Sequence, residues 1–202
     1  ARKILVTALV AIWGLRLSIY IFKRNWGKPE DYRYRALRKI AGEKFWQVSY
    51  WQVFLFQGLL LALIAAPILV AQASALPDQL TVLDVIGTLV WAIGLFFEAV
   101  GDWQLARFKR IPENKGKVMQ SGLWRSTRHP NYFGDVTLWW GLFLIALGTP
   151  GGWWTIISPI IMTVLLLRVT GVSLLEKGLG KTKPDYQEYV KRTSVFFPWF
   201  PR

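Results

Sequence analysis

Five stretches of the chain are almost wholly apolar, and polar segments separate them. Each stretch approaches the roughly 20 residues that a helix needs to cross a bilayer, although the fourth is short. The fourth and fifth are joined by 148–152, a run of glycine, threonine and proline without charge, which predicts a tight helical hairpin. We therefore predict an all-α fold, a polytopic transmembrane helix bundle, with five spans at 4–22, 51–73, 80–100, 132–147 and 153–171.

The composition also indicates a membrane protein. Apolar residues make up 53% of the 202 residues and aromatic residues 15%, whereas charged residues reach only 18%, below the roughly 25% of soluble domains. This hydrophobicity excludes a disordered chain, and a soluble nucleic-acid-binding protein would not contain such apolar runs. We therefore expect the lipid bilayer and a small molecule as partners, and no nucleic acid.

Two features of the composition limit the chemistry. The chain has no Cys, which excludes disulfides, thiolate zinc sites and cysteine nucleophiles. Its single His excludes a site with several histidine ligands. We expect no metal.

The positive charges form three clusters on alternate sides of successive spans. Of 25 Lys and Arg residues, eight lie in 23–44, seven in 107–128 and six in 177–202, and the net charge is +13. The intervening loops, 74–79 and 148–152, contain none. The positive-inside rule therefore places the three basic segments in the cytoplasm. We expect the membrane to be a bacterial inner membrane or, in a eukaryote, the endoplasmic reticulum. Two cations fall on the opposite side: Arg2 and Lys3.

Several ionisable residues lie inside the predicted spans. A charge at the centre of a spanning helix costs on the order of 2.5–3.5 kcal/mol, so such residues usually face the interior of a bundle and indicate a functional site. Asp84 lies near the outer end of its predicted span, so we expect it at the membrane–water interface. The full set is Arg16, Asp84, Glu98, Asp102, Asp135 and Arg168.

Two of these carboxylates form a polar stripe on one helix. Glu98 and Asp102 are four residues apart and Lys109 follows seven later, so all three fall within roughly 40° of one helix face. The stripe runs from the apolar span into the basic end of the helix and predicts a binding site. The alternative is an ion pair with Arg16 or Arg168 that only holds helices together.

The segment 121–135 offers groups that bind anions. Pro130 is compatible with the first turn of a helix, whose free N–H groups attract negative charge. Arg125, Arg128 and His129 come directly before this turn. Asn131 and Asp135 share a face of the new helix and provide an amide and a carboxylate. The alternative is a basic turn beside the membrane without a ligand.

This segment also resembles a known family. The run Gly122-Leu-Trp-Arg-x-x-Arg-His-Pro-Asn-Tyr-Phe-Gly-Asp135 is similar to the cofactor segment of the membrane steroid 5-alpha-reductase family and of related sterol reductases. The polar stripe and the tail around Tyr186 and Tyr189 match the same family. The resemblance covers nearly the whole chain and is greatest to an uncharacterised, mainly bacterial branch.

The resemblance implies both a fold and an activity. The family has about seven helices, so we expect 1–202 to be a single domain that lacks one or two N-terminal helices. Its members bind NADPH from the cytoplasm and reduce an activated C=C bond of a steroid-like or other lipid enone. Neither the resemblance nor the pattern identifies the catalytic residue, for which Glu98 and Tyr132 are the candidates.

The resemblance also implies a set of NADPH-binding residues. Those for the nicotinamide and ribose are Glu98, Asp102, Asn131 and Asp135, with Tyr132 and His129 beside them. Those for the phosphates are Lys28, Lys109, Arg125 and Arg128, and those on the adenosine side are Arg168, Tyr186 and Tyr189.

The chain departs from the resembled family at one position. In characterised steroid reductases a tyrosine helps to polarise the substrate ketone, and Trp13 stands at that position here.

Two other functions therefore stay open. A membrane methyltransferase of the isoprenylcysteine or phospholipid type, which uses S-adenosylmethionine, would share the helical hairpin and the Arg-His-Pro turn. Such enzymes usually carry paired glutamates after the last span, where this chain has Glu176 and Lys177. The third hypothesis is a lipid-binding membrane protein without catalysis. The many Lys and Arg residues favour NADPH.

Overall fold

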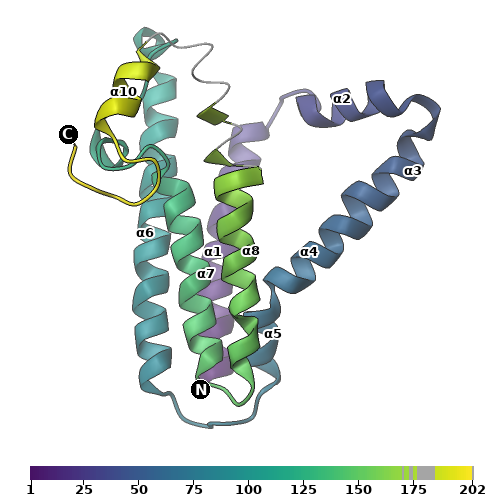
Figure 1. Cartoon of the computed structure of the whole chain (residues 1–202), viewed down its shortest axis with the longest axis vertical. Coiled ribbons are helices and arrows are strands. Elements are labelled where there is room, and N and C mark those ends of the chain that lie inside the picture. The colour runs from purple at the N-terminus through teal and green to yellow at the C-terminus, as the bar shows by residue number, and fades with distance from the viewer. Residues whose placement is uncertain (170, 173–174, 177–184, 202) are drawn as a thin grey trace.

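The computed structural model describes residues 1–169, 171–172, 175–176 and 185–201. In this part of the chain the architecture is a helix bundle without β-strands, and the only bridge pairs Thr127 with Ser194. The predicted all-α class is confirmed. Its longest helices, α1 (Arg2–Asn25) and α6 (Val82–Arg110), run along the bundle beside α7 (Pro130–Leu147) and α8 (Ile157–Val164) (Figure 1).

Four described helical segments are long and apolar enough to cross a membrane. They are Arg2–Asn25, Arg33–Ile64, Val82–Arg110 and Gly152–Val169. The last combines η5 (Gly152–Ile156), α8 and η6 (Leu165–Val169).

Helix α7 is the remaining long helix of the bundle. It contacts α5, α6 and α8, and it buries Leu138, Leu142 and Ile145 almost completely. Because protein rather than lipid surrounds much of α7, its sequence tolerates Asn131 and Asp135 near its start. The helix therefore completes the predicted bundle.

The second predicted span has different boundaries from those expected. Instead of one helix over 51–73, the structure has a break at Ala65 between α4 (Phe56–Ile64) and α5 (Ala66–Ala73). Pro67 explains this break, because proline has no N–H to donate and is accommodated only in the first turn of a helix.

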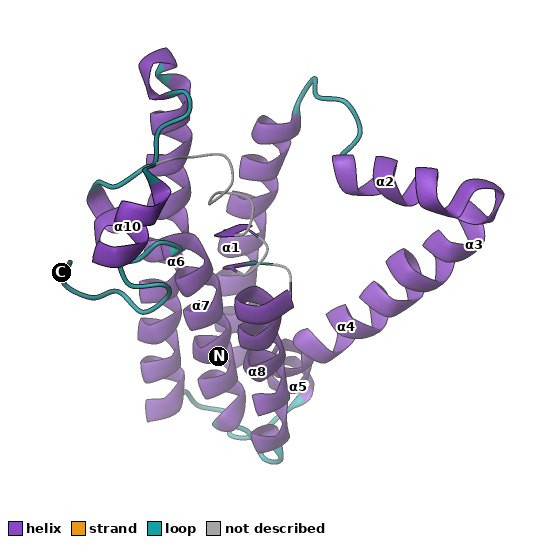
Figure 2. Ribbon diagram, turned by 45° about the horizontal axis from the view of Figure 1, so that its top comes forward, coloured by secondary structure: helices purple, strands orange, loops and turns teal. Residues whose placement is uncertain are grey.

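Before α4, the helical segment extends well beyond the predicted start. It consists of α2 (Tyr32–Ala41), η1 (Gly42–Lys44), α3 (Phe45–Ser49) and the π-helix η2 (Tyr50–Leu55). Two views show that α2, α3 and most of α4 stand apart from the bundle, whereas α5 lies within it (Figures 1 and 2).

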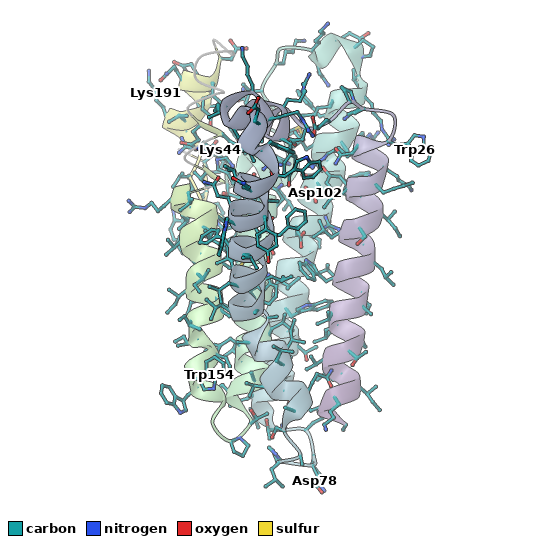
Figure 3. All side chains as sticks on the ribbon, turned by 90° about the vertical axis from the view of Figure 1, so that its right-hand side faces the viewer. Trp26, Lys44, Asp78, Asp102, Trp154 and Lys191 are labelled. Atoms are coloured by element: carbon teal, nitrogen blue, oxygen red, sulfur yellow. The ribbon has the colours of Figure 1, made fainter. Side chains whose placement is uncertain are left out.

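The structure gathers the described parts of the basic segments at one end of the bundle, which we call the basic end, whereas 177–184 of the third segment lie outside the described residues. The end of α1, α2, the end of α6 and α10 (Tyr186–Arg192) all lie there (Figure 1). Lys44, Lys191 and Trp26 lie toward this end in a side view, and Asp78 and Trp154 lie at the opposite end (Figure 3). This arrangement is the one that the alternating charge clusters predict.

The topology leads to a labelling prediction. Single cysteines at Glu113 and Asp78, both exposed and at opposite ends, should react with a membrane-impermeant maleimide from opposite sides of the membrane. We expect Glu113→Cys to be labelled from the cytoplasmic side, because it follows the basic end of α6. The parent chain contains no cysteine and serves as the unlabelled control. Labelling of Glu113→Cys only from the outer side would overturn the orientation.

The opposite end contains a buried ion pair that accounts for the misplaced cation Arg2. Its guanidinium binds the carboxylate of Asp84 through two contacts of 2.7 Å. The side chains are only 5% and 1% exposed. Asp84 also accepts hydrogen bonds from the N–H and hydroxyl of Thr81, which cap α6. Asp84 lies in the first turn of α6 as a buried partner of Arg2, which it neutralises locally, and its place at the membrane interface stays a prediction.

Breaking this pair should destabilise the bundle. Arg2→Met leaves the carboxylate of Asp84 buried without its counter-charge, and we expect a loss of about 3–5 kcal/mol of unfolding free energy. Adding Asp84→Asn should restore part of the loss, because the remaining side chain is neutral. Unfolding of the purified protein in detergent measures both variants. An Arg2→Met protein as stable as the parent would show that the pair contributes nothing.

Glycines on α6 and α7 allow these two helices to approach closely. A Cβ atom at Gly141 would lie 2.6 Å from the carbonyl oxygen of Gly87 and 2.6 Å from the backbone nitrogen of Trp91. A Cβ atom at Gly134 would lie 2.5 Å from the carbonyl oxygen of Gly94. Such small residues are typical of helix contacts in membranes. We call this glycine-lined contact between α6 and α7 the seam. It brings the start of α7 against the polar stripe of α6.

Candidate functional site at the basic end of the bundle

An arginine on α1 joins the two carboxylates of the predicted stripe. The two terminal nitrogens of Arg16 each lie 2.6 Å from a carboxylate oxygen, one of Glu98 and one of Asp102. The guanidinium also donates to the backbone carbonyl of Glu98 at 3.0 Å. The Arg16 side chain is 20% exposed, and the carboxylates are 6% and 7% exposed. The sequence allowed Arg16 or Arg168 as the ion-pair partner of these carboxylates, and in the structure the partner is Arg16.

Neighbouring polar groups from α1 and α7 complete this network. The indole N–H of Trp13 donates to Oε2 of Glu98 at 3.1 Å, and the side-chain amide of Asn131 donates to Oδ1 of Asp102 at 3.1 Å. The ring of Trp13 packs edge-on against Trp139, with centroids 5.6 Å apart. Three helices therefore meet at the stripe, and each supplies a hydrogen-bonding group.

Asp135 adds a third carboxylate to the same region. It lies one turn after Asn131 on α7, and its Oδ1 atom is buried without a hydrogen-bond partner in the described part of the chain. The indole of Trp139, one turn further on, is buried next to this carboxylate. The carboxylate of Asp135 thus lies near the two carboxylates, of Glu98 and Asp102, that bind the guanidinium of Arg16.

A cavity of about 690 Å³ opens between α1 and α6 beside this network. Among the described residues, Asp102 is the only acidic one in its lining. The basic lining residues are Arg16, Lys23, Arg24, Lys28, Lys109 and Arg110, and the aromatic ones are Tyr20, Trp26 and Trp103. The volume is within the range of roughly 300–1,000 Å³ that is typical of small-molecule sites.

The depth of the cavity follows from the rise of an α-helix. At about 1.5 Å per residue, Asp102 lies about 30 Å from the start of α6 at Val82, and Glu98 about 24 Å. The hydrocarbon core of a bilayer is about 30 Å thick. The cavity therefore lies where the spanning helices leave the hydrocarbon core at the basic end, within reach of water. Glu98 lies about one helix turn deeper in the core than Asp102.

The structure brings seven of the predicted site residues to this region. Lys28, Asp102 and Lys109 line the cavity, and Glu98 lies next to it through Arg16. Asn131 binds Asp102, Asp135 follows one turn later, and Tyr132 lies between them on α7. The ring of Tyr132 is parallel to that of His129, with centroids 5.6 Å apart.

A second cluster forms around Glu176, which follows the last span. One oxygen of its carboxylate lies 3.0 Å from Nε of Arg128 and 3.1 Å from Nε2 of His129. Burial raises the pKa of the Glu176 carboxyl, but contacts with His129 and Arg128 outweigh burial and hold this pKa below its ordinary value. Arg128 and His129 are buried and do not line the α1–α6 cavity.

The predicted tail tyrosines are buried on α10. Burial and the charge of Glu176 raise the pKa of the Tyr186 hydroxyl to about 12. Burial also raises the pKa of Tyr189, whose hydroxyl donates to the backbone carbonyl of Trp124 at 2.5 Å. The N–H of Arg128 donates to the carbonyl of Ser194. These contacts join the C-terminal segment to the turn before α7.

The remaining predicted residues lie elsewhere. Arg125 is exposed in the short helix η4 (Gly122–Arg125), and Arg168 is exposed in η6. Neither belongs to the lining of the α1–α6 cavity. The predicted binding set is thus divided between the cavity, the Glu176 cluster and two exposed positions.

The sequence interpretation gave no role to several residues that the structure places at the site. Trp13, Tyr20 and Arg24 lie on the same face of α1 as Arg16, at spacings of three, four and eight residues. That spacing is visible in the sequence and could have identified them. Glu176 is different, because only the folded arrangement of the segment after the last span brings it to Arg128.

A family model matches residues 1–193, and the chain belongs to that family, DUF1295, which is described as proteins of unknown function. The chain is 24% identical over 223 aligned residues to an uncharacterized protein of Schizosaccharomyces pombe, an alignment that covers 98% of this chain and 64% of that protein. It is 39% identical over 62 residues to a probable O-methyltransferase of Ustilaginoidea virens, which covers 31% of this chain and 22% of that protein. The chain thus spans less than two thirds of the length of either relative. No solved structure matches it significantly.

Proposed function

We propose that the protein is an integral membrane oxidoreductase that uses NADPH to reduce an activated C=C bond of a lipid enone. The observation that carries this proposal is the α1–α6 cavity, which combines six basic lining residues with one carboxylate. We further propose that the basic end is cytoplasmic, so that the cavity faces the compartment from which NADPH is supplied.

The charge of the cavity suits a cofactor with several phosphate charges. Lys28 and Lys109 lie in the lining together with four further cations. Such a concentration of positive charge attracts a polyanion and neutralises its phosphates. The resemblance to steroid 5-alpha-reductases assigns phosphate contacts to the same two lysines. The cavity would therefore hold the phosphate part of NADPH.

The polar groups beside the cavity fit the nicotinamide and ribose part. Asp102 can accept a hydrogen bond from a hydroxyl group, and the buried Oδ1 of Asp135 has no partner in the described residues. Asn131, held on Asp102, offers an amide at the same place. When bound, NADPH supplies the hydride for the reduction. Arg16 fixes the positions of Glu98 and Asp102 from the opposite helix.

A reduction of this kind also requires a proton donor. Glu98 and Tyr132 remain our candidates, since Glu98 belongs to the network around Arg16 and Tyr132 directly follows Asn131, which binds Asp102. Trp13 donates to Glu98 and occupies the position where the resembled enzymes have a tyrosine that acts on the substrate. The substrate is therefore proposed as a class, a lipid enone that enters from the bilayer, and not as a particular steroid.

The cofactor can be tested by ligand-dependent stability. NADPH should raise the melting temperature of the purified protein in nanodiscs, because a ligand at 100 times its Kd stabilises the native state by about 2.7 kcal/mol. Lys28→Glu should weaken NADPH binding, whereas Lys191→Glu, at an exposed residue of α10 outside the cavity, should not. No stabilisation by NADPH, or equal effects of both substitutions, would refute the proposal.

A methyltransferase that uses S-adenosylmethionine is the second candidate. The match to a probable O-methyltransferase favours it. The Arg-His-Pro turn that such enzymes share contacts Glu176 after the last span, although Lys177 stands where the methyltransferases considered above carry a second glutamate. In that case S-adenosylmethionine should stabilise the protein and NADPH should not. Glu176→Gln would then remove the stabilisation.

A further inference from the structure

Helix α2 has little support from the rest of the protein. It contains ten residues, and its main contacts are with α3 and η1, directly after it in the chain. Figures 1 and 2 show it at the basic end, set apart from the bundle and lying across the direction of the spanning helices. Its residues from Arg33 to Ile40 are exposed, apart from the half-buried Leu37.

Such a short helix needs an additional surface. Isolated helices below about 12–15 residues are marginal in water, because too few hydrogen bonds repay the cost of nucleation. The ends of α2 are capped: Asp31 accepts from the N–H of Arg33 at 2.9 Å, and Gly42 has a positive φ of 51°. Caps stabilise helix ends by about 1 kcal/mol, which does not replace a packing surface.

The sequence of α2 shows what that surface is. At 100° per residue, Arg35, Arg38 and Lys39 fall within about 100° of arc, and Ala36, Leu37 and Ile40 fall within a similar arc on the opposite side. The first-turn Arg33 also falls within the apolar arc, where its guanidinium pairs with Asp31 at 3.0 Å. The helix contains no acidic residue. The side chain of Ile40 is 85% exposed. A helix with one cationic and one apolar face is typical of the membrane–water interface.

The position of α2 in the chain supports the same interpretation. It forms the first part of the helical segment Arg33–Ile64, which continues through η1 and α3 into η2 and α4. Trp46 of α3 is 72% exposed. Tryptophan is enriched at membrane interfaces, where its ring meets both lipid and water. The guanidinium of Arg38 lies over the ring of Phe45 at 4.1 Å and holds the corner between α2 and α3.

We propose that α2 is an interfacial helix that binds anionic phospholipids at the basic end. Its apolar face, with Ile40, enters the boundary between headgroups and acyl chains. Arg35 and Lys39 contact the lipid phosphates from the other face, an attraction that anionic headgroups provide and zwitterionic ones do not. This site is separate from the α1–α6 cavity, whose lining includes none of the residues 33–41 of α2. It would exist whether or not NADPH is the cofactor.

Spin labels at single cysteines can test this proposal, because the chain has none of its own. Ile40→Cys and Lys39→Cys are labelled in the full chain, reconstituted in phosphatidylcholine vesicles with or without phosphatidylglycerol. Collision with oxygen reports burial in lipid, and collision with a water-soluble nickel complex reports exposure to water. With phosphatidylglycerol present, we expect the label at 40 to be shielded from nickel and accessible to oxygen, and the label at 39 to be accessible to nickel.

The charge requirement has a matched control. In the Ile40→Cys protein, neutralising Arg35 and Lys39 to Gln should move the label toward water, as should omission of phosphatidylglycerol. Neutralising Lys115 and Lys191, two exposed lysines outside α2, changes the net charge equally and should leave the label buried. A label at 40 exposed to nickel in phosphatidylglycerol vesicles would overturn the proposal. So would a depth that responds neither to the anionic lipid nor to Arg35 and Lys39, or one that responds equally to the control pair.

Discussion

Gly134→Ala should separate the two central helices and lower the unfolding free energy by about 3 kcal/mol or more. The added Cβ would lie 2.5 Å from the carbonyl oxygen of Gly94 and would also meet the backbone of Glu98. These neighbours are backbone atoms, so no side-chain rotation relieves the contact. The helices must move apart, and the contact of Asn131 with Asp102 moves with them. Thermal or denaturant unfolding in detergent measures the loss.

Two other glycines provide controls for this substitution. A Cβ at Gly14 on α1 or at Gly58 on α4 would have no atom within 4 Å. Gly14→Ala and Gly58→Ala should therefore stabilise their helices by about 0.5–1 kcal/mol, because alanine loses less backbone entropy than glycine. The sign of the effect should thus differ between the seam and the exposed helix faces. Gly134→Ala with the stability of these controls would mean that α6 and α7 are not in close contact.

The seam illustrates a signal in the sequence that our interpretation did not use. Gly87, Gly94 and Gly101 recur every seven residues on α6, and Gly134 and Gly141 do so on α7. A period of seven keeps small residues near one helix face, which is typical of close contacts between membrane helices. The pattern identifies a packing face. It does not identify the partner, because the sequence alone does not pair one glycine row with the other.

The ends of the bundle could be predicted because the rule for them is local. Each basic segment is judged by its own Lys and Arg content, and the structure places 23–44 and 107–128 at the same end as predicted. The break at Ala65 was missed although Pro67 was visible, because apolar content continues across it. A hydrophobic run indicates that lipid or protein covers a segment, but it does not indicate whether that segment is one continuous helix.

At the candidate site, too, spacing along one helix could be predicted from the sequence, whereas contacts between helices could not. Spacing along α6 correctly placed Glu98 and Asp102 on one face, since both bind one guanidinium. The choice between Arg16 and Arg168 as partner depends on which helix packs against α6, and the spacing carries no information on that. The contact of Glu176 with Arg128 joins residues 48 positions apart and depends on how the chain continues after the last span.

The largest effect on the site should come from removing Arg16, the counter-charge that Glu98 and Asp102 both contact. Arg16→Met leaves Glu98 and Asp102 buried without the guanidinium that both contact, beside the third carboxylate of Asp135. We expect a loss of about 3–5 kcal/mol of unfolding free energy, as for other buried pairs broken on one side. Asp102→Asn and Glu98→Gln should cost only about 1 kcal/mol each, because Arg16 keeps one carboxylate and the number of like charges falls.

The same three variants distinguish a binding site from a structural ion pair. Asp102 lines the cavity and Glu98 does not, so Asp102→Asn should weaken NADPH binding about ten- to hundredfold, which corresponds to the roughly 1.5–3 kcal/mol of a charge-assisted hydrogen bond. Glu98→Gln should affect NADPH affinity less. Melting temperature without ligand and NADPH affinity are measured on each variant. If Asp102→Asn melts as low as Arg16→Met and binds NADPH as tightly as the parent, the carboxylates only hold α1 and α6 together, and the cofactor site lies elsewhere.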